Sequence, residues 1–231
     1  MSITANYTFS KAIVDYPQDE EYFDANPFRD IANPRLDRAL SSLDSTQVVL
    51  INGLYELPFG HGRAFLNGQH GILNALVSDW QTNGIFNFTT GRPLALTAGY
   101  DLLNQNVAST PNFNHSFSNL STVHKSATAV TFITAAQEAA FTNPAPGSAG
   151  NLPTAAIHGP GYANLDVSLF KSFGFGVLHE KAKLQFRAEF FNSLNHANFE
   201  GPTVNINSAS FGNRASTYAP RVGQLAAKIT F

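Results

Sequence analysis

The sequence predicts an all-β fold, an antiparallel up-and-down transmembrane β-barrel segment of about six strands with long extracellular loops. Three observations support this prediction. The final residues alternate in polarity as far as the terminal Phe231. Charged residues make up 13% of the 231 residues, against roughly 25% in typical soluble domains. The segments between the expected strands are alternately long and short.

The strands are expected near residues 2–12, 46–57, 75–90, 162–173, 182–192 and 221–231. One face of the first carries Ile3, Ala5, Tyr7 and Phe9, since side chains alternate along a strand. The second is less regular, because apolar residues occur on both of its faces before Pro58 interrupts it. One face of the third carries Leu76, Trp80, Thr82, Gly84, Phe86 and Phe88.

A long segment over 91–160, with one short helical pattern around 133–141, separates these strands from the last three. One face of the fourth carries Ala163, Leu165, Val167 and Leu169, and one face of the fifth carries Leu184, Phe186, Ala188 and Phe190. On the last strand the apolar or small set is Gly223, Leu225, Ala227, Ile229 and Phe231. Chain ends usually fray, whereas the closing strand of an outer-membrane barrel must pair and has an outer face against lipid.

The connections form a second pattern. In order they are expected to span about 33, 17, 71, 8 and 28 residues, whereas compact soluble domains prefer loops of roughly 4–6. Bacterial outer-membrane barrels have long loops outside and short turns on the periplasmic side. If the C-terminus is periplasmic, the last strand descends from outside, and all three long connections are extracellular.

Composition excludes several classes of protein. The chain has no Cys, so disulfides and Cys-based metal sites are excluded. No run of about 18 apolar residues occurs, so no transmembrane helix is expected. A net charge of -2 argues against a nucleic-acid partner, which would require a basic patch. The start lacks a signal peptide, so we expect the C-terminal piece of a longer protein.

Five segments occur in order along the chain: Tyr7–Ile13, Tyr55–Gly60, Gly84–Leu94, Gly159–Phe170 and Leu184–His196. They resemble segments near the end of TonB-dependent receptors, in particular the Oar-like group, which carries an N-terminal carboxypeptidase-regulatory-like domain. The resemblance implies a barrel of about 22 strands in the outer membrane. It also implies an N-terminal plug and a box that contacts TonB. The plug, the box and the earlier strands are expected to lie outside this chain.

The chain end resembles the signal that the outer-membrane barrel-assembly machinery reads. In that pattern a polar residue, a Gly and two apolar or aromatic residues occur at fixed spacing. The corresponding positions here are Gln224, Ala226, Ile229 and Phe231. Ala226 replaces the Gly, which is a mild departure because both residues are small.

The fifth strand carries a row of polar side chains opposite its apolar face: Lys183, Gln185, Arg187 and Glu189. One interpretation is a lumen-facing row that contacts solute or plug. The favoured one is an ordinary hydrated wall, whose charges pair across strands at about 0.2–1 kcal/mol each. Both interpretations place the row inward, because Lys or Arg at the bilayer midplane costs about 2–4 kcal/mol.

No catalytic, metal or cofactor site is expected. An acidic cluster in the first long connection lacks the Ca²⁺-loop spacing and is interpreted as solvated: Asp15, Asp19, Glu20, Glu21 and Asp24. The seven His have no metal-ligand spacing, and no Gly-x-Ser-x-Gly elbow occurs. Trp80, Tyr55 and Tyr7 are expected to form interfacial belts.

The function expected from these features is energised uptake of a bulky solute, such as an oligosaccharide or siderophore, with no enzymatic step. The expected partners are outer-membrane lipid, the assembly machinery, the rest of the barrel with its plug, and TonB through the missing N-terminal region. One alternative is a structural or adhesion-type barrel without active transport. A second is a soluble β-sandwich binding module, which would bury its apolar faces against each other.

The isolated chain is expected to aggregate in water. About six strands cannot close, because the smallest common barrels use about eight, and open edges with an exposed apolar band promote association. Size-exclusion chromatography and thermal unfolding in detergent-free buffer test this expectation. A monodisperse monomer with a cooperative melt would contradict it.

Overall fold

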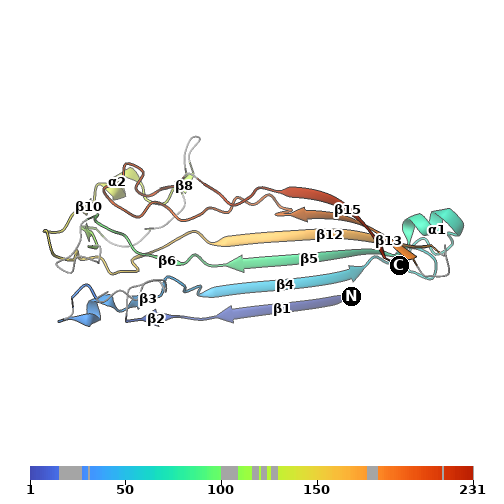
Figure 1. Cartoon of the computed structure of the whole chain (residues 1–231), viewed down its shortest axis with the longest axis horizontal. Helices are drawn as coiled ribbons and strands as arrows, with labels where there is room; N and C mark the ends of the chain where they lie inside the picture. Colours follow the sequence, from blue (N-terminus) through green and yellow to red (C-terminus); the bar gives the residue numbers. More distant parts are fainter. Residues whose placement is uncertain are drawn as a thin grey trace.

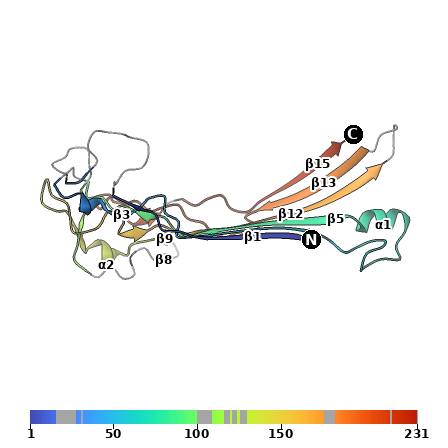
Figure 2. The same cartoon turned by 90° about the horizontal axis from the view of Figure 1, so that it is seen from below.

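The structure is a computed structural model that describes residues 1–15, 28–30, 32–99, 109–115, 120, 124–125, 130–175, 182–214 and 216–230. Its centre is a 6-stranded antiparallel sheet, which curves along its width (Figures 1 and 2). Its strands, in spatial order, are β1 (Ser2–Phe9), β4 (Gln47–Glu56), β5 (Trp80–Thr89), β12 (Tyr162–Phe175), β13 (Ala182–Phe191) and β15 (Val222–Thr230). Each pairs with the next strand of the sheet along the chain, which confirms the antiparallel up-and-down arrangement.

The third strand of the sheet starts later than its alternation suggests. Residues Gly71–Val77 form helix α1, so Leu76 lies on a helix instead of on the strand face where it was expected. Helix and strand are separated by Asp79, whose φ of 59° neither element accommodates. The helical pattern around 133–141 corresponds to α2 (Ala135–Glu138), which begins with a capping box between Thr134 and Gln137. In the described part of the chain, no helix is long and apolar enough to cross a membrane.

The register of the sheet brings the apolar sets of its strands onto one face, here called the apolar face. For example, Gly53, Gly84, Val167, Phe190 and Gly223 form one continuous row across five strands. The opposite face, here called the polar face, carries the asparagine, aspartate, glutamate and arginine side chains of the strands. Within the described strands, Lys171 is the one charged residue on the apolar face.

Large side chains of the apolar face are exposed. Leu225 is 86% exposed, Phe9 67% and Ile3 57%. A soluble β-sandwich would cover such a face with a second sheet, so this exposure argues against that alternative. Aromatic residues occur near both ends of the face, with Trp80 and Phe88 on β5. At about 3.4 Å per residue they lie roughly 27 Å apart along the strand, and tilted strands in membranes present an apolar band about 25 Å tall.

Long and short connections lie at opposite ends of the sheet (Figure 1). The connections over 10–46, 90–161 and 192–221 form the long-connection end. The short-connection end holds the 57–79 connection with α1, the end of β12, the start of β13, the start of β1 and the end of β15. This alternation along the chain is the one that the sequence predicts for an outer-membrane barrel.

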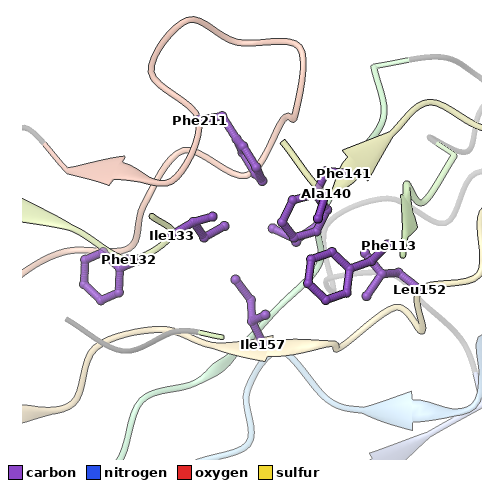
Figure 3. Packing of buried hydrophobic residues seen from close by; sticks show 9 residues of the cluster. Phe113, Phe132, Ile133, Ala140, Phe141, Leu152, Ile157 and Phe211 are labelled. Carbon is purple, nitrogen blue, oxygen red and sulfur yellow. The ribbon is translucent and has the colours of Figure 1, made fainter. Parts of the chain in front are cut away.

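The hydrophobic core lies among the long connections and not on the sheet (Figure 3). Phe132 is fully buried, and Phe141 contacts Phe113 at 4.6 Å and Phe211 at 5.2 Å between ring centroids. The remaining elements here are short: β2 (Ile13–Val14), η1 (Pro34–Asp37), β3 (Ala39–Leu40), β6 (Pro93–Leu94), β7 (Asn112–Phe113), β8 (His124–Lys125), β9 (Val130–Thr131), β10 (Phe141–Thr142), β11 (Ile157–His158) and β14 (Asn213–Arg214).

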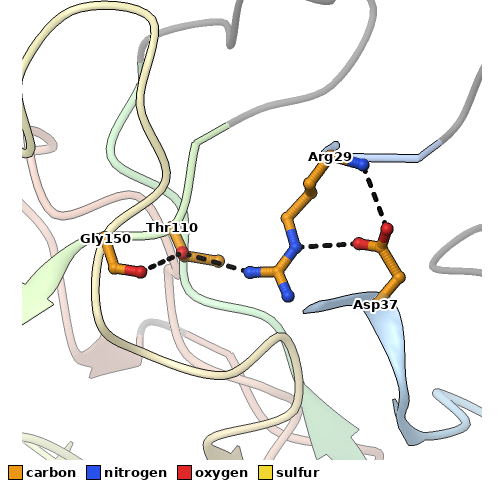
Figure 4. Close-up of polar contacts among 4 residues, drawn as sticks. All are labelled: Arg29, Asp37, Thr110 and Gly150. Carbon is orange, nitrogen blue, oxygen red and sulfur yellow. Dashed lines mark hydrogen bonds and ion pairs between the residues drawn. The ribbon is translucent and has the colours of Figure 1, made fainter. Parts of the chain in front are cut away.

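A buried ion pair lies within the 10–46 connection, and its arginine hydrogen-bonds a second long connection (Figure 4). The side chains of Arg29 and Asp37 are 4% and 0% exposed, and Arg29 Nε lies 2.8 Å from Asp37 Oδ1. Arg29 Nη1 donates to Thr110 Oγ1 at 3.4 Å, and this hydroxyl donates to the Gly150 carbonyl at 3.4 Å. The 10–46 connection is thereby attached to the 90–161 connection.

Asp37→Ala is expected to destabilise the long-connection end by about 3–5 kcal/mol, because it leaves the Arg29 guanidinium buried and unpaired. Limited proteolysis with mass-spectrometric mapping measures this as faster cleavage in 28–46 and 109–115. The double variant Arg29→Met/Asp37→Leu is the control, since an apolar pair of similar size is often close to neutral. Equal cleavage of the single variant and the wild type would contradict the assigned role.

Candidate functional site

The polar row expected on β13 is assembled on the polar face. Arg187 Nε donates to Gln185 Oε1 at 2.8 Å, and Arg187 Nη1 lies 3.9 Å from Glu189 Oε1. Gln224 Nε2 on β15 donates to Glu189 Oε2 at 2.5 Å. Lys183 lies on the same face, at the short-connection end of the strand. The row is therefore a network along β13 that extends to β15.

The network has the features of a hydrated wall. The side chains of Arg187 and Glu189 are 42% and 20% exposed, so water screens their pairing. The Arg187 guanidinium also lies 5.4 Å from the centre of the Phe170 ring on β12, which supports it from one side. These contacts pair Gln185, Arg187 and Glu189 with partners inside the sheet.

A cavity of about 510 Å³ lies where the polar face meets the long-connection end. Thr89 and Tyr162, whose side chains point to the polar face, form its floor. The full lining comprises Ser45, Thr89, Thr90, Arg92, Leu94, Gly159, Pro160, Gly161, Tyr162, Phe199, Glu200, Gly201 and Tyr218. Five separate stretches of sequence contribute to it, and for this reason the sequence prediction missed it.

Close backbone packing shapes one wall of the cavity. A Cβ on Gly91 would lie 1.8 Å from the Gly159 carbonyl oxygen, so a side chain there would separate the two segments. The Gly159 amide donates to the Arg92 carbonyl at 2.7 Å. The glycines in Gly91-Arg-Pro and Gly159-Pro-Gly-Tyr therefore let these segments lie side by side above the sheet.

An asparagine-rich turn after β13 precedes the stretch Phe199–Gly201, which is another part of the lining. Asn192 and Asn195 adopt φ values of 47° and 51°, a region that asparagine tolerates better than most residues. Asp166 Oδ1 accepts from the Asn192 amide at 2.9 Å, and Asn198 Oδ1 accepts from the Ala163 amide at 2.8 Å. These bonds attach the turn after β13 to β12.

The same turn places an aromatic residue at the cavity. The Tyr218 amide donates to the Asn198 carbonyl at 2.9 Å. The Tyr218 ring then meets the Tyr162 ring edge-on, with 5.5 Å between centroids. The segment Asn192–Asn198 thus has a structural role that its polar composition did not reveal.

The chemistry of the lining is mixed. Two tyrosines offer aromatic surfaces and hydroxyl groups, while Arg92 and Glu200 supply one charge of each sign. Glu200 Oε2 accepts from Ser216 Oγ at 2.6 Å. Aromatic rings beside polar groups suit a solute that has apolar faces and many hydroxyl or charged groups. Among the described residues, no group of three or more His, Asp or Glu could hold a metal ion.

The other residues singled out from the sequence lie apart from this cavity. Gln224 and Ala226 of the expected assembly signal point to the polar face and Ile229 to the apolar face, while Phe231 lies outside the described residues. Asp15 is exposed at 3.9 Å from Arg38, and the acidic residues Asp19, Glu20, Glu21 and Asp24 also lie outside the described residues.

The aromatic residues expected to form belts are on the apolar face. Trp80 and Tyr55 lie towards the short-connection end, and Tyr7 lies towards the long-connection end. This placement is the one required of interfacial belts at two levels.

Comparison with known families gives one match. The model of a family described as an outer membrane beta barrel domain matches residues 1–224. No curated protein and no solved structure matches the chain.

Removing one charge from the β13 row is expected to change stability by no more than about 1 kcal/mol, because the Arg187–Glu189 pair is partly exposed. Glu189→Gln tests this, since glutamine keeps an oxygen that accepts from Gln224. Unfolding in urea from detergent micelles gives the free-energy difference, with Gln185→Glu as the matched change of opposite sign. A loss of unfolding free energy several-fold larger would contradict this, because it would mean that the fold depends on the Arg187–Glu189 pair.

Proposed function

Given that the chain belongs to the outer-membrane β-barrel domain family and is located in the outer membrane, we propose that it forms wall and external mouth in a TonB-dependent receptor resembling the Oar-like group. The receptor takes up a bulky solute, such as an oligosaccharide or siderophore, with energy supplied from the periplasm. This chain contributes a surface for the solute and no enzymatic step.

The observation that carries the proposal is the position of the cavity. It lies on the polar face, opposite the apolar face, and at the end where the three long connections gather. In a barrel with its apolar face against lipid, the polar face lines the lumen. The cavity is then an indentation in the lumen wall beneath the mouth, where an incoming solute first meets the barrel.

The assignment to TonB-dependent receptors is supported by the resemblance in sequence. The five resembling segments overlap the five neighbouring strands β1, β4, β5, β12 and β13, so the likeness follows the wall of the sheet. The further partners in this proposal are the rest of the barrel with its plug, TonB, and the machinery that inserts β15. The open edges of β1 and β15 are where neighbouring wall strands pair.

A passive or adhesion-type barrel is the competing proposal. It would use the same apolar face and the same register, so the described strands do not separate the two. The two differ in energy dependence, since a plugged receptor needs energy to admit its solute and an open barrel does not.

Tyr162→Ala and Tyr218→Ala are each expected to weaken solute uptake at low concentration by about two- to tenfold, since an aromatic contact contributes about 0.5–1.5 kcal/mol. The measurement is uptake of labelled maltooligosaccharides and ferric siderophores by cells that express the complete receptor. Tyr7→Ala is the matched control, because Tyr7 lies on the apolar face away from the cavity. An uncoupler of the proton gradient should abolish uptake by the wild type.

Uptake that survives the uncoupler would overturn active transport in favour of a passive barrel. Energised uptake that is unchanged in both tyrosine variants would retain the transporter but remove the cavity from the solute path. Absence of uptake, together with attachment of cells to a surface, would favour the adhesion-type barrel.

A further inference from the structure

Helix α1, at the short-connection end, has an apolar side that faces outward. Ile72 is 81% exposed, Leu73 60% and Leu76 54%. Spacings of three and four residues place these side chains on one side of the helix. The other side is held by the connection itself, since Asn74 Oδ1 accepts from the His61 amide at 2.7 Å.

Two contacts fix the C-terminal end of α1 beside the apolar face of the sheet. Trp80 Nε1 donates to the Leu76 carbonyl at 2.9 Å, and the Lys171 ammonium donates to the Ser78 carbonyl. Trp80 and Lys171 are paired residues on β5 and β12, and both point to the apolar face. The helix end therefore lies on the membrane side of the sheet.

The position of Lys171 indicates where the hydrocarbon layer ends. An ammonium group facing lipid is costly unless polar groups satisfy it. Lys171 is only 3% exposed, and its Nζ lies 5.4 Å from the Trp80 ring centre and 4.8 Å from that of Phe173. A lysine flanked by aromatic rings, next to an indole that hydrogen-bonds a carbonyl, is an arrangement suited to the headgroup level of a bilayer.

We propose that α1 is an interfacial anchor, which lies in the leaflet at the short-connection end and inserts Ile72, Leu73 and Leu76 at the boundary of headgroups and acyl chains. The apolar side of α1 contacts phospholipid, because it continues the apolar face of a sheet located in the outer membrane. An amphipathic helix buries its apolar side at this depth. The anchor fixes the height of the barrel in the membrane.

Depth-dependent fluorescence quenching tests the anchor. These 231 residues contain no Cys, so Ile72→Cys and Leu73→Cys each add one thiol for a bimane label, and any Cys elsewhere in the complete protein is first replaced by Ser. The complete protein is reconstituted into vesicles of phosphatidylethanolamine and phosphatidylglycerol that contain lipids spin-labelled near the headgroup. Gly68→Cys is the matched control in the same connection, where an added Cβ has no neighbour within 4 Å. Leu225→Cys, on the apolar face, reports insertion of the sheet itself.

Labels at 72 and 73 are expected to be quenched roughly threefold more strongly than the label at 68, with emission shifted to the blue. Quenching at 225 without excess quenching at 72 and 73 would overturn the anchor and leave the barrel intact. A blue shift at 72 and 73 without lipid quenching would overturn it in favour of a protein partner. Absence of quenching at 225 would instead contradict insertion of the sheet.

Discussion

A shift of one residue in the pairing of any two strands would move an apolar set from one face of the sheet to the other. The register of this chain avoids that at every junction, from Ile3 opposite Gly53 on one edge to Phe190 opposite Gly223 on the other. Backbone hydrogen bonds fix this pairing, because groups left unpaired in hydrocarbon cost several kcal/mol each. The apolar face, the polar face and the positions of Trp80 and Lys171 all depend on it.

The long-connection end follows a different physical principle. Its core is made of aromatic and aliphatic side chains from the connections themselves, among them Phe132 and Phe141, and buried polar contacts join the connections to one another. The bonds of Asp166 and Asn198 attach this end to β12. The cavity lies at the junction, where Thr89 and Tyr162 of the sheet meet lining residues that come from the connections.

Local alternation predicted the sheet well, since a period of two needs no knowledge of distant residues. It failed for residues 71–79. Leu76 continues the alternation of β5, but it belongs to helix α1, and the positive φ of Asp79 separates that helix from the start of β5. The β13 row was also accessible from the sequence, because its four members lie on one strand. The cavity was not, because Ser45, Arg92, Tyr162 and Tyr218 come together only through the fold. The pairing of Arg29 with Asp37 was missed for a related reason, as composition alone gave no sign of burial.

The hydrophobic cluster and the apolar face are separate, and this separation affects how such a chain can evolve. Substitutions around Phe132 and Phe211 alter the shape of the long-connection end, yet these residues are not part of the 6-stranded sheet. Substitutions on the strands alter contact with lipid, yet they leave that cluster intact. The two halves are therefore free to diversify at different rates, and chains with the same wall can present unrelated outer surfaces to the environment.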